Sequence, residues 1–254
     1  MGWGDELMAA GEARLLHRQT GHKIGICAGR WTGPLASVLW RGIDYIAQPG
    51  ESFKKRVIDS PRRRPYRRAS TPLGSVWREY RPIPAEIAFA KGELEFAERC
   101  GRGFVVVEPH VKSEREGAVN RQWGWDRYGA VIAGTPDVRW VQFGMPGTKI
   151  LPGATHIETP TFRTACAILA RAAAYVGPEG GLHHACAAVG TPAIVIFGGY
   201  ISPRATGYPE HVNLFAGEGL GCGRRLKCQC DCMESILPST VIEALLRILG
   251  GSHT

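Results

Sequence analysis

A glycine-rich segment in the last third of the chain carries the residues best suited to chemistry. Residues 175–199 read YVGPEGGLHHACAAVGTPAIVIFGG: an apolar strand, a glycine-rich turn, a helix of small residues and a second apolar strand. Glycines at a strand-to-helix turn allow backbone N–H groups to approach a phosphate, and the helix N-terminus adds a favourable potential. The segment predicts a site for a phosphorylated ligand, although a tight turn before a packed helix explains the same residues without one.

A run of basic residues lies in the first third of the chain. Between residues 54 and 68 (the basic run) eight basic side chains stand against one acid, Asp59, so this run holds most of the formal net charge of +8. Like charges in a row repel one another, so a folded protein exposes them or pairs them with an anion. Three interpretations stay open: a solvated loop, a nucleic-acid contact, and a binding site for a phosphorylated or carboxylated substrate.

Half of the eight cysteines are clustered near the C-terminal end, as Cys222, Cys228, Cys230 and Cys232. C-x-C pairs are poorly suited to intrachain disulfides, and no secretory signal is visible, so we expect a reducing compartment. Structural zinc sites mostly use C-x2–4-C pairs, so the spacing predicts no metal, with a thiolate metal site as the open alternative. No apolar run approaches the ~20 residues of a membrane helix, which favours a cytoplasmic protein without a transmembrane segment.

The elements that must position these residues alternate between strands and helices. The 254 residues suffice for one large α/β domain or two compact ones, and 44% hydrophobic with 21% charged residues excludes disordered and collagen-like classes. Strands are expected at 22–28, 43–47, 104–108, 140–143, 174–176 and 193–197, and helices at 7–17, 85–100, 125–133, 164–173, 183–189 and 238–249. This alternation predicts parallel β-α-β units. A Pro- and Arg-rich break at 61–84 divides a smaller unit, 1–84, from a larger one, 85–254.

The glycine-rich segment resembles the C-terminal signature of family 9 glycosyltransferases, the ADP-heptose:lipopolysaccharide heptosyltransferase family. That signature is V-G-[ND]-[ST]-G-x-x-H-x-A-A-A-x-G-T-P-x-x-x-x-[FY]-G. Glu179 takes the usual Asp position and Gly180 the Ser/Thr position, Gly181 and His184 match directly, and 190–192 and 197–198 complete the pattern.

Three further segments resemble the same family. Residues 3–7 (WGDEL) match its opening G-D-x-[LV] turn, 104–123 match a strand and loop that ends in a basic residue near Trp, and 232–236 (CMESI) match its cysteine-rich tail. The resemblance implies an α/β GT-B fold with two Rossmann-like domains, parallel sheets and a reduced N-terminal domain. Four departures stand out: little chain precedes Gly4, the chain is shorter than typical family members, Glu179-Gly180 replaces Asp-Ser/Thr, and no acidic residue for the donor ribose is evident after Gly144.

The resemblance also assigns roles. It implies an inverting, metal-independent transfer of a hexose or heptose from a nucleotide sugar, ADP- or UDP-linked, with no further cofactor. Asp5 would be the general base, while Arg121 or Lys112 would neutralise the donor diphosphate and Glu179, Gly180, Gly181 and His184 would line the donor site. An anionic acceptor would dock on the basic run, with Arg62, Arg63 and Arg64 as its contacts, at a location peripheral to the inner membrane.

Two alternatives remain open at this point. The acceptor could be a modified base in DNA rather than a lipopolysaccharide core or other glycan, because arginines suit either kind of anion. The chain could also be a non-catalytic nucleotide- or nucleic-acid-binding module on the same fold. The sequence carries no information on the oligomeric state.

Overall fold

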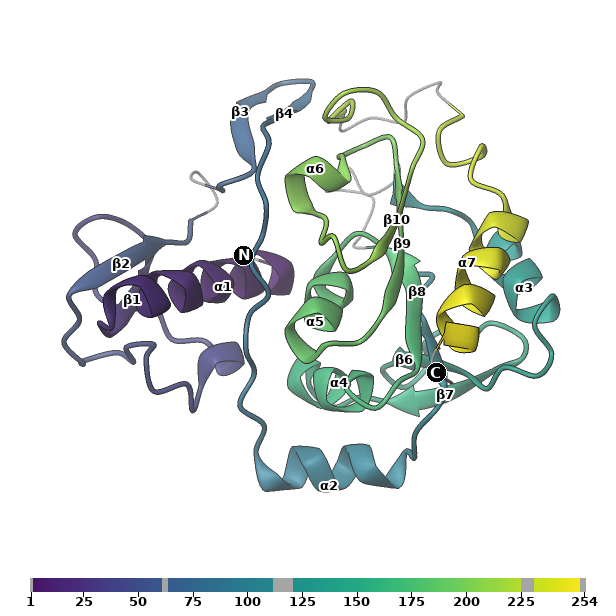
Figure 1. The fold of residues 1–254 in the computed structure, drawn as a ribbon, viewed down its shortest axis with the longest axis horizontal. Coiled ribbons are helices and arrows are strands. Elements are labelled where there is room, and N and C mark those ends of the chain that lie inside the picture. Colours follow the sequence, from purple (N-terminus) through teal and green to yellow (C-terminus); the bar gives the residue numbers. More distant parts are fainter. Residues whose placement is uncertain (1, 61–63, 112–120, 225–230, 252–254) are drawn as a thin grey trace.

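The main sheet has six parallel strands in the order β10-β9-β8-β5-β6-β7 (Figure 1). The computed structural model describes residues 2–60, 64–111, 121–224 and 231–251. The strands are β5 (Val105–Val107), β6 (Trp140–Gly144), β7 (Ala154–Glu158), β8 (Ala174–Pro178), β9 (Ala193–Gly198) and β10 (Val212–Phe215). In the register, Val106 pairs with Val141 on one side and with Tyr175 on the other.

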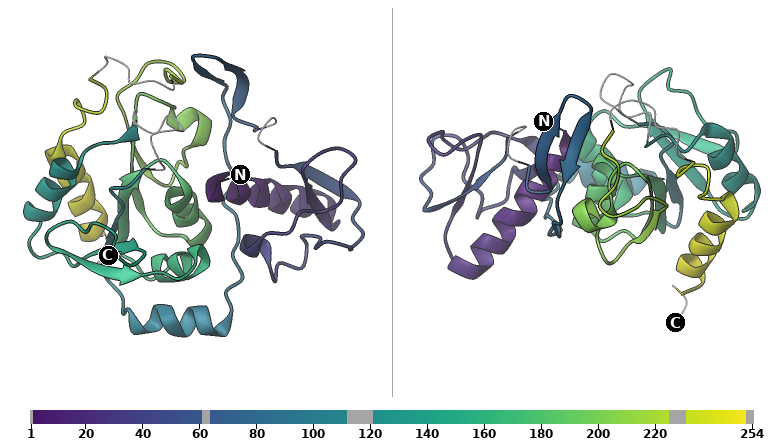
Figure 2. Two further views of the ribbon diagram at one scale, coloured as in Figure 1. Left: turned by 180° about the vertical axis from the view of Figure 1, so that it is seen from behind. Right: turned by 90° about the horizontal axis from the view of Figure 1, so that it is seen from above.

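Helices cover both faces of this sheet, as the views of Figure 2 show. One face packs against α4 (Phe162–Leu169) and α5 (Gly181–Val189), and the other packs against α3 (Trp125–Ala133) and α7 (Pro238–Gly250). Successive residues of a strand alternate between the faces, so Val106 belongs to the first core cluster while Val105 and Val107 belong to the second. This two-sided burial explains why the central strands are continuous apolar runs.

The strand order reverses between β5 and β8. From this point β6 and β7 continue in one direction and β9 and β10 in the other. In open α/β sheets, ligands bind outside the carboxyl ends of the strands at such a reversal. The topology therefore directs attention to the residues that follow Val107 and Pro178.

The N-terminal part is built around helix α1 (Trp3–Thr20). Its sheet consists of two parallel strands, β1 (Ile24–Cys27) and β2 (Lys55–Ile58), and a short 3-10 helix, η1 (Val38–Trp40), lies between them in sequence. Buried side chains of α1 such as Leu7 and Met8 belong to the same core cluster as Val106 of the main sheet. The helix therefore joins the two sheets through one continuous core (Figure 1).

The segment expected to be an irregular break contains an antiparallel hairpin, β3 (Arg67–Thr71) and β4 (Gly74–Trp77). The hairpin is held from outside: the Trp77 indole donates to the Tyr200 carbonyl at 2.8 Å, and the Ser75 amide donates to the Gly223 carbonyl at 2.9 Å. These partners lie far along the chain, which is why local sequence did not reveal the hairpin.

Most of the expected elements are observed with small shifts of their ends, and two expectations were wrong. Residues 43–47 form turns and a single bridge from Ile46 to Ile24, because the amides of Ile43 and Ile46 donate locally to carbonyls three residues back. The helix expected over 85–100 starts only at Lys91, as α2 (Lys91–Arg99).

The extended course before α2 has a tertiary cause. The carbonyls of Pro84 and Ala88 accept hydrogen bonds from the buried or half-buried guanidinium groups of Arg14 and Arg163. These two contacts hold the segment in its extended course. Arg163 also pairs with Glu93 at 2.7 Å, so α4, α2 and this extended segment are joined at one cation.

The boundary expected at residues 84/85 falls within the extended stretch between β4 and α2. Strands β2, β3, β4, β7 and β10 were not expected from the sequence. The remaining described helix is α6 (Pro203–Thr206). Among the described residues, no helix combines the length and the apolar character needed to cross a membrane.

Candidate functional site

A cavity of about 780 Å³ opens at the carboxyl ends of β5 and β8, where the strand order reverses. It lies between the first turn of α1 and the first turn of α5. Its polar lining comprises Asp5, Glu6, Arg64, Tyr66, Glu108, His110, Arg121, Thr159, Thr161, Glu179, Gly180, Gly181 and His184.

The cavity brings together seven of the residues predicted for the site. These are Asp5, Arg64, Arg121, Glu179, Gly180, Gly181 and His184. Lys112, Arg62 and Arg63 lie outside the described residues. Elsewhere in the basic run, Lys54, Lys55, Arg56 and Arg68 are exposed and do not line the cavity.

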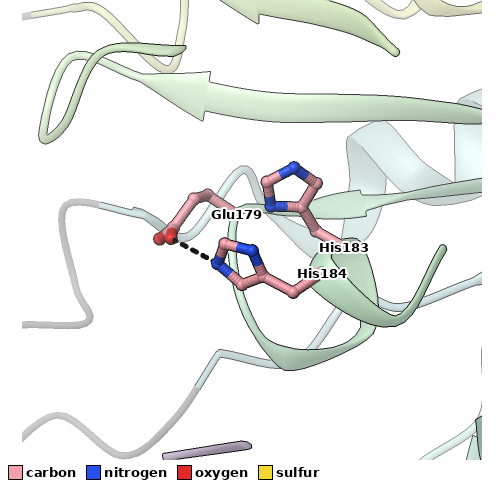
Figure 3. A group of neighbouring side chains, drawn as sticks. All are labelled: Glu179, His183 and His184. Carbon is pink, nitrogen blue, oxygen red and sulfur yellow. Dashed lines mark ion pairs between the residues drawn. The ribbon is translucent and has the colours of Figure 1, made fainter. Parts of the chain in front are cut away.

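Glu179 is held as an anion between two partners at the end of β8. Arg121 donates to its Oε2 at 3.0 Å. On the other side, Nε2 of His184 lies 3.7 Å from its Oε1 (Figure 3). Burial opposes ionisation of this carboxyl, yet the contact with His184 and the charge of Arg121 outweigh it and lower its pKa to about 2. Glu179 is therefore charged at any ordinary pH.

His184 orients this carboxylate from the first turns of α5. Its ring is buried, and its Nδ1 lies 3.0 Å from the Tyr208 hydroxyl. In the tautomer in which Tyr208 donates to Nδ1, the proton sits on Nε2 and faces Glu179. Burial raises the pKa of Tyr208, so its hydroxyl keeps its proton for this role.

The N-terminus of α5 is open to the same cavity. Gly180 precedes the helix, and Gly180, Gly181 and Leu182 line the cavity. The first N–H groups of a helix have no partner within it and carry a partial positive charge, so this end can accept phosphate oxygens.

Asp5 belongs to a second cluster in the cavity, which forms a wall built from α1 and the residues just before β3. Arg64 pairs with its Oδ2 at 2.8 Å, and the Tyr66 hydroxyl donates to its Oδ1 at 2.6 Å. Burial, followed by the charge of Asp5, raises the pKa of Tyr66 well above its usual value, so the phenol remains a donor.

Glu108 and His110 form a third group in the cavity, directly after β5. Oε1 of Glu108 accepts hydrogen bonds from the His110 amide at 2.7 Å and from its ring at 3.0 Å. This hydrogen bond raises the pKa of His110. Sequence reasoning missed both residues, although their position at the end of an expected strand could have revealed them. Tyr66 and Tyr208 left no local signal.

Glu179, His183 and His184 also form a group that could be considered for a metal, since their ligand atoms lie within 4.8 Å of one another. Ligand atoms around a tetrahedral zinc lie about 3.4 Å apart, given Zn–N and Zn–O distances of about 2.1 Å. Nε2 of His184 lies 3.7 Å from Oε1 of Glu179, and Arg121 already occupies the other oxygen, Oε2. The arrangement thus fits an ion pair better than a metal site.

The cysteine cluster is only partly described. Cys222 is exposed and Cys232 is buried, whereas Cys228 and Cys230 lie outside the described residues. The alternative of a thiolate metal site there stays an untested prediction.

Comparison with known proteins finds similarity in structure. E. coli ADP-heptose LPS heptosyltransferase II is 16% identical, with a TM-score of 0.51, and the match covers 72% of this chain and 57% of that chain. A glycosyl transferase family 9 protein from Veillonella parvula is 15% identical, with a TM-score of 0.49, over 66% of this chain and 54% of that chain. No protein-family model matches the sequence, and no curated protein matches it.

At this level of identity the likeness establishes the fold and nothing finer. The chain spans little more than half the length of these two solved structures. The expected fold class is confirmed: this is an α/β chain of the GT-B kind, with a six-stranded parallel sheet and a smaller N-terminal part that contains a two-stranded parallel sheet.

Proposed function

We propose that this protein is an inverting glycosyltransferase that moves a sugar from a nucleotide-sugar donor to an anionic acceptor. One observation carries the proposal: a single cavity at the reversal of the strand order holds both the Asp5 carboxylate and an anion-binding wall. That wall consists of the N-terminus of α5 and the side chain of Arg121.

The roles follow from the chemistry of each wall. The diphosphate of an ADP- or UDP-linked sugar would bind at the N-terminus of α5, with Arg121 beside it and Glu179 fixing the position of Arg121. Asp5 would accept the proton of the attacking hydroxyl while the oxygen of that hydroxyl bonds to the anomeric carbon. The bond from that carbon to the diphosphate breaks, and its electron pair leaves with the nucleoside diphosphate.

The acceptor class rests on charge. Arg64 lies in the cavity beside Asp5, and Lys54, Lys55, Arg56 and Arg68 of the run are exposed. Guanidinium groups bind phosphates and carboxylates in forked geometry, so an acceptor glycan bearing such groups suits this side of the cavity. We propose that transfer needs no metal, and a chelator is then without effect on the rate.

A thermal-shift screen with ADP-, GDP-, UDP- and CMP-sugars tests the donor. A nucleotide sugar at 100 times its Kd should stabilise the protein by ~2.7 kcal/mol, which such a screen resolves. The effective donor is then incubated at high enzyme concentration, and release of nucleoside diphosphate is followed with and without acceptor.

The control is Arg247→Gln, which removes an exposed cation from α7 without touching the cavity. Stabilisation together with donor turnover supports the proposal. Stabilisation without any turnover supports a non-catalytic binding module instead, and absence of stabilisation by every nucleotide sugar refutes the donor assignment.

A further inference from the structure

Asp5, Arg64 and Tyr66 form a closed ring of hydrogen bonds. Arg64 contacts Asp5 through Nη2 at 2.8 Å and donates to the Tyr66 hydroxyl through Nη1 at 3.1 Å. The same hydroxyl donates to the other oxygen of Asp5 at 2.6 Å. Both oxygens of the proposed base therefore already accept strong donors.

The ring is largely shielded from water. The exposed fraction is 10% for the Asp5 side chain and 25% for that of Arg64, and Tyr66 is buried. An ion pair in such surroundings is screened less than one on the surface, so the contact between Arg64 and Asp5 is a strong one. An attacking hydroxyl must compete with Arg64 for Asp5.

Arg64 nevertheless has unused binding capacity. Its Nε is buried and, among the described residues, has no hydrogen-bond partner. The guanidinium belongs to a segment between β2 and β3 rather than to the interior of a helix. When the guanidinium turns from Asp5 toward the cavity, a phosphate or carboxylate there can accept from Nε and from a neighbouring Nη together, which is the forked geometry these anions favour.

We infer that Arg64 determines acceptor specificity. Arg64 stays paired with Asp5 until an anionic group of the acceptor replaces Asp5 as the partner of the guanidinium. This inference rests on the proposed function. An acceptor with a phosphate or carboxylate near its attacking hydroxyl draws Arg64 from Oδ2 and frees that oxygen to take the hydroxyl proton. A neutral acceptor leaves the ion pair between Arg64 and Asp5 intact and therefore receives the sugar slowly.

Hydrolysis of the donor tests this without knowledge of the acceptor, because water can replace the attacking hydroxyl. Water gives one proton to Asp5, and the water oxygen bonds to the anomeric carbon. The bond from that carbon to the diphosphate breaks, and its electron pair leaves with the nucleoside diphosphate. The probe is the nucleotide sugar that gives the largest thermal shift, held at saturation so that the rate reports kcat. Inorganic phosphate serves as the anion, with ionic strength kept constant by KCl.

In wild type, phosphate should accelerate hydrolysis. In the absence of phosphate, Arg64→Gln should hydrolyse the donor about tenfold faster than wild type. This factor is smaller than the ~10²–10⁴-fold rate enhancement of a general base, because wild-type Asp5 is restrained but not absent. Phosphate should then have no further effect. Tyr66→Phe keeps Arg64 and frees one oxygen only, so it should show a smaller rise and still respond to phosphate.

Arg247→Gln is the matched control, since it removes an exposed arginine far from the cavity, and it should behave as wild type. If Arg64→Gln folds poorly, Arg64→Lys is used instead, because it retains the charge but loses the two-pronged guanidinium. Its rate of donor hydrolysis should lie between those of wild type and the glutamine variant. Calorimetric titration of the donor against each variant separates effects on binding from effects on kcat.

Two outcomes overturn the inference: hydrolysis by Arg64→Gln that is no faster than wild type, or a wild-type rate indifferent to phosphate. Failure of the proposed function has a different signature. It would appear as no binding of any nucleotide sugar, or as unchanged hydrolysis in Asp5→Asn.

Discussion

The ring of His184 lies directly against the backbone of Gly4. A β-carbon placed on Gly4 would come within 2.6 Å of Cδ2 of His184, closer than real contacts allow. The first turn of α1 and the first turns of α5 are therefore in contact, at two residues that both line the cavity. Since His184 also faces Glu179, the position of Gly4 beside Asp5 links the two walls of the site.

Gly4→Ala tests this contact. The added methyl must displace the His184 ring and with it the orientation of Glu179, and overpacking of this kind costs about 1–3 kcal/mol. We expect a lower free energy of unfolding in denaturant titration and weaker donor binding in calorimetry. Gly129→Ala in α3 is the matched control, because a β-carbon there meets nothing within 4 Å and alanine favours a helix by up to about 1 kcal/mol. Equal stability of the two variants would contradict the close contact.

Asp5→Asn should remove transfer and leave donor binding nearly intact. The amide keeps the size of the side chain but cannot take the proton of the attacking hydroxyl, so the rate should fall by ~10²–10⁴-fold. Steady-state release of nucleoside diphosphate and calorimetric titration of the donor give the two quantities. Asp44→Asn, at an exposed position outside the cavity, should change neither. Turnover at the wild-type rate would exclude Asp5 as the base.

Arg121→Ala should destabilise the fold as well as weaken donor binding. It leaves the Glu179 carboxylate buried without its cation, and loss of one partner from a buried pair costs about 3–5 kcal/mol. The double variant with Glu179→Ala should recover part of that loss in denaturant unfolding. Arg247→Ala breaks an exposed pair with Glu243 at 3.7 Å and should cost less than about 1 kcal/mol. Strictly additive losses in the double variant would argue against coupling between Arg121 and Glu179.

Asp59→Asn should stabilise the protein in a manner that depends on pH. Burial, together with the carboxylates of Asp5 and Glu6, raises the pKa of Asp59 from 3.8 to about 6. Between these values the folded state binds more protons than the unfolded state, so wild-type stability falls as pH rises through that window and then levels off.

The variant lacks this dependence. The difference in the free energy of unfolding between the variant and wild type should therefore grow from pH 4 to pH 6.5. It should reach at most about 3 kcal/mol, which is the free-energy equivalent of the pKa shift of Asp59. Chemical denaturation at a series of pH values measures the difference. A gain that is the same at pH 4 and pH 7 would show that ionisation of Asp59 is not its cause.

Local patterns predicted the central elements well where burial is uniform. The strands predicted at 104–108 and 193–197 lie between helices on both faces, so residues 104–107 and 193–197 are all apolar and the runs are visible in the sequence. The edge strands β7 and β10 are only half buried and carry mixed residues, which explains why they were missed. The extended course of 85–90 depends on Arg14 and Arg163, whose contacts cannot be read from neighbouring residues.

The sequence by itself determined the alternating α/β pattern and the glycine-rich turn before α5, because these depend on residue type over short spans. The family resemblance of its motifs supplied the candidates Asp5, Arg121, Glu179 and His184. Only the tertiary structure decided how the candidates are paired. Asp5 meets Arg64 and Tyr66 across some sixty residues of chain, and Glu179 meets Arg121 across 58. Ion pairs and hydrogen bonds act over a few ångströms in space, so partners distant in sequence are set by how the sheets and α1 pack together.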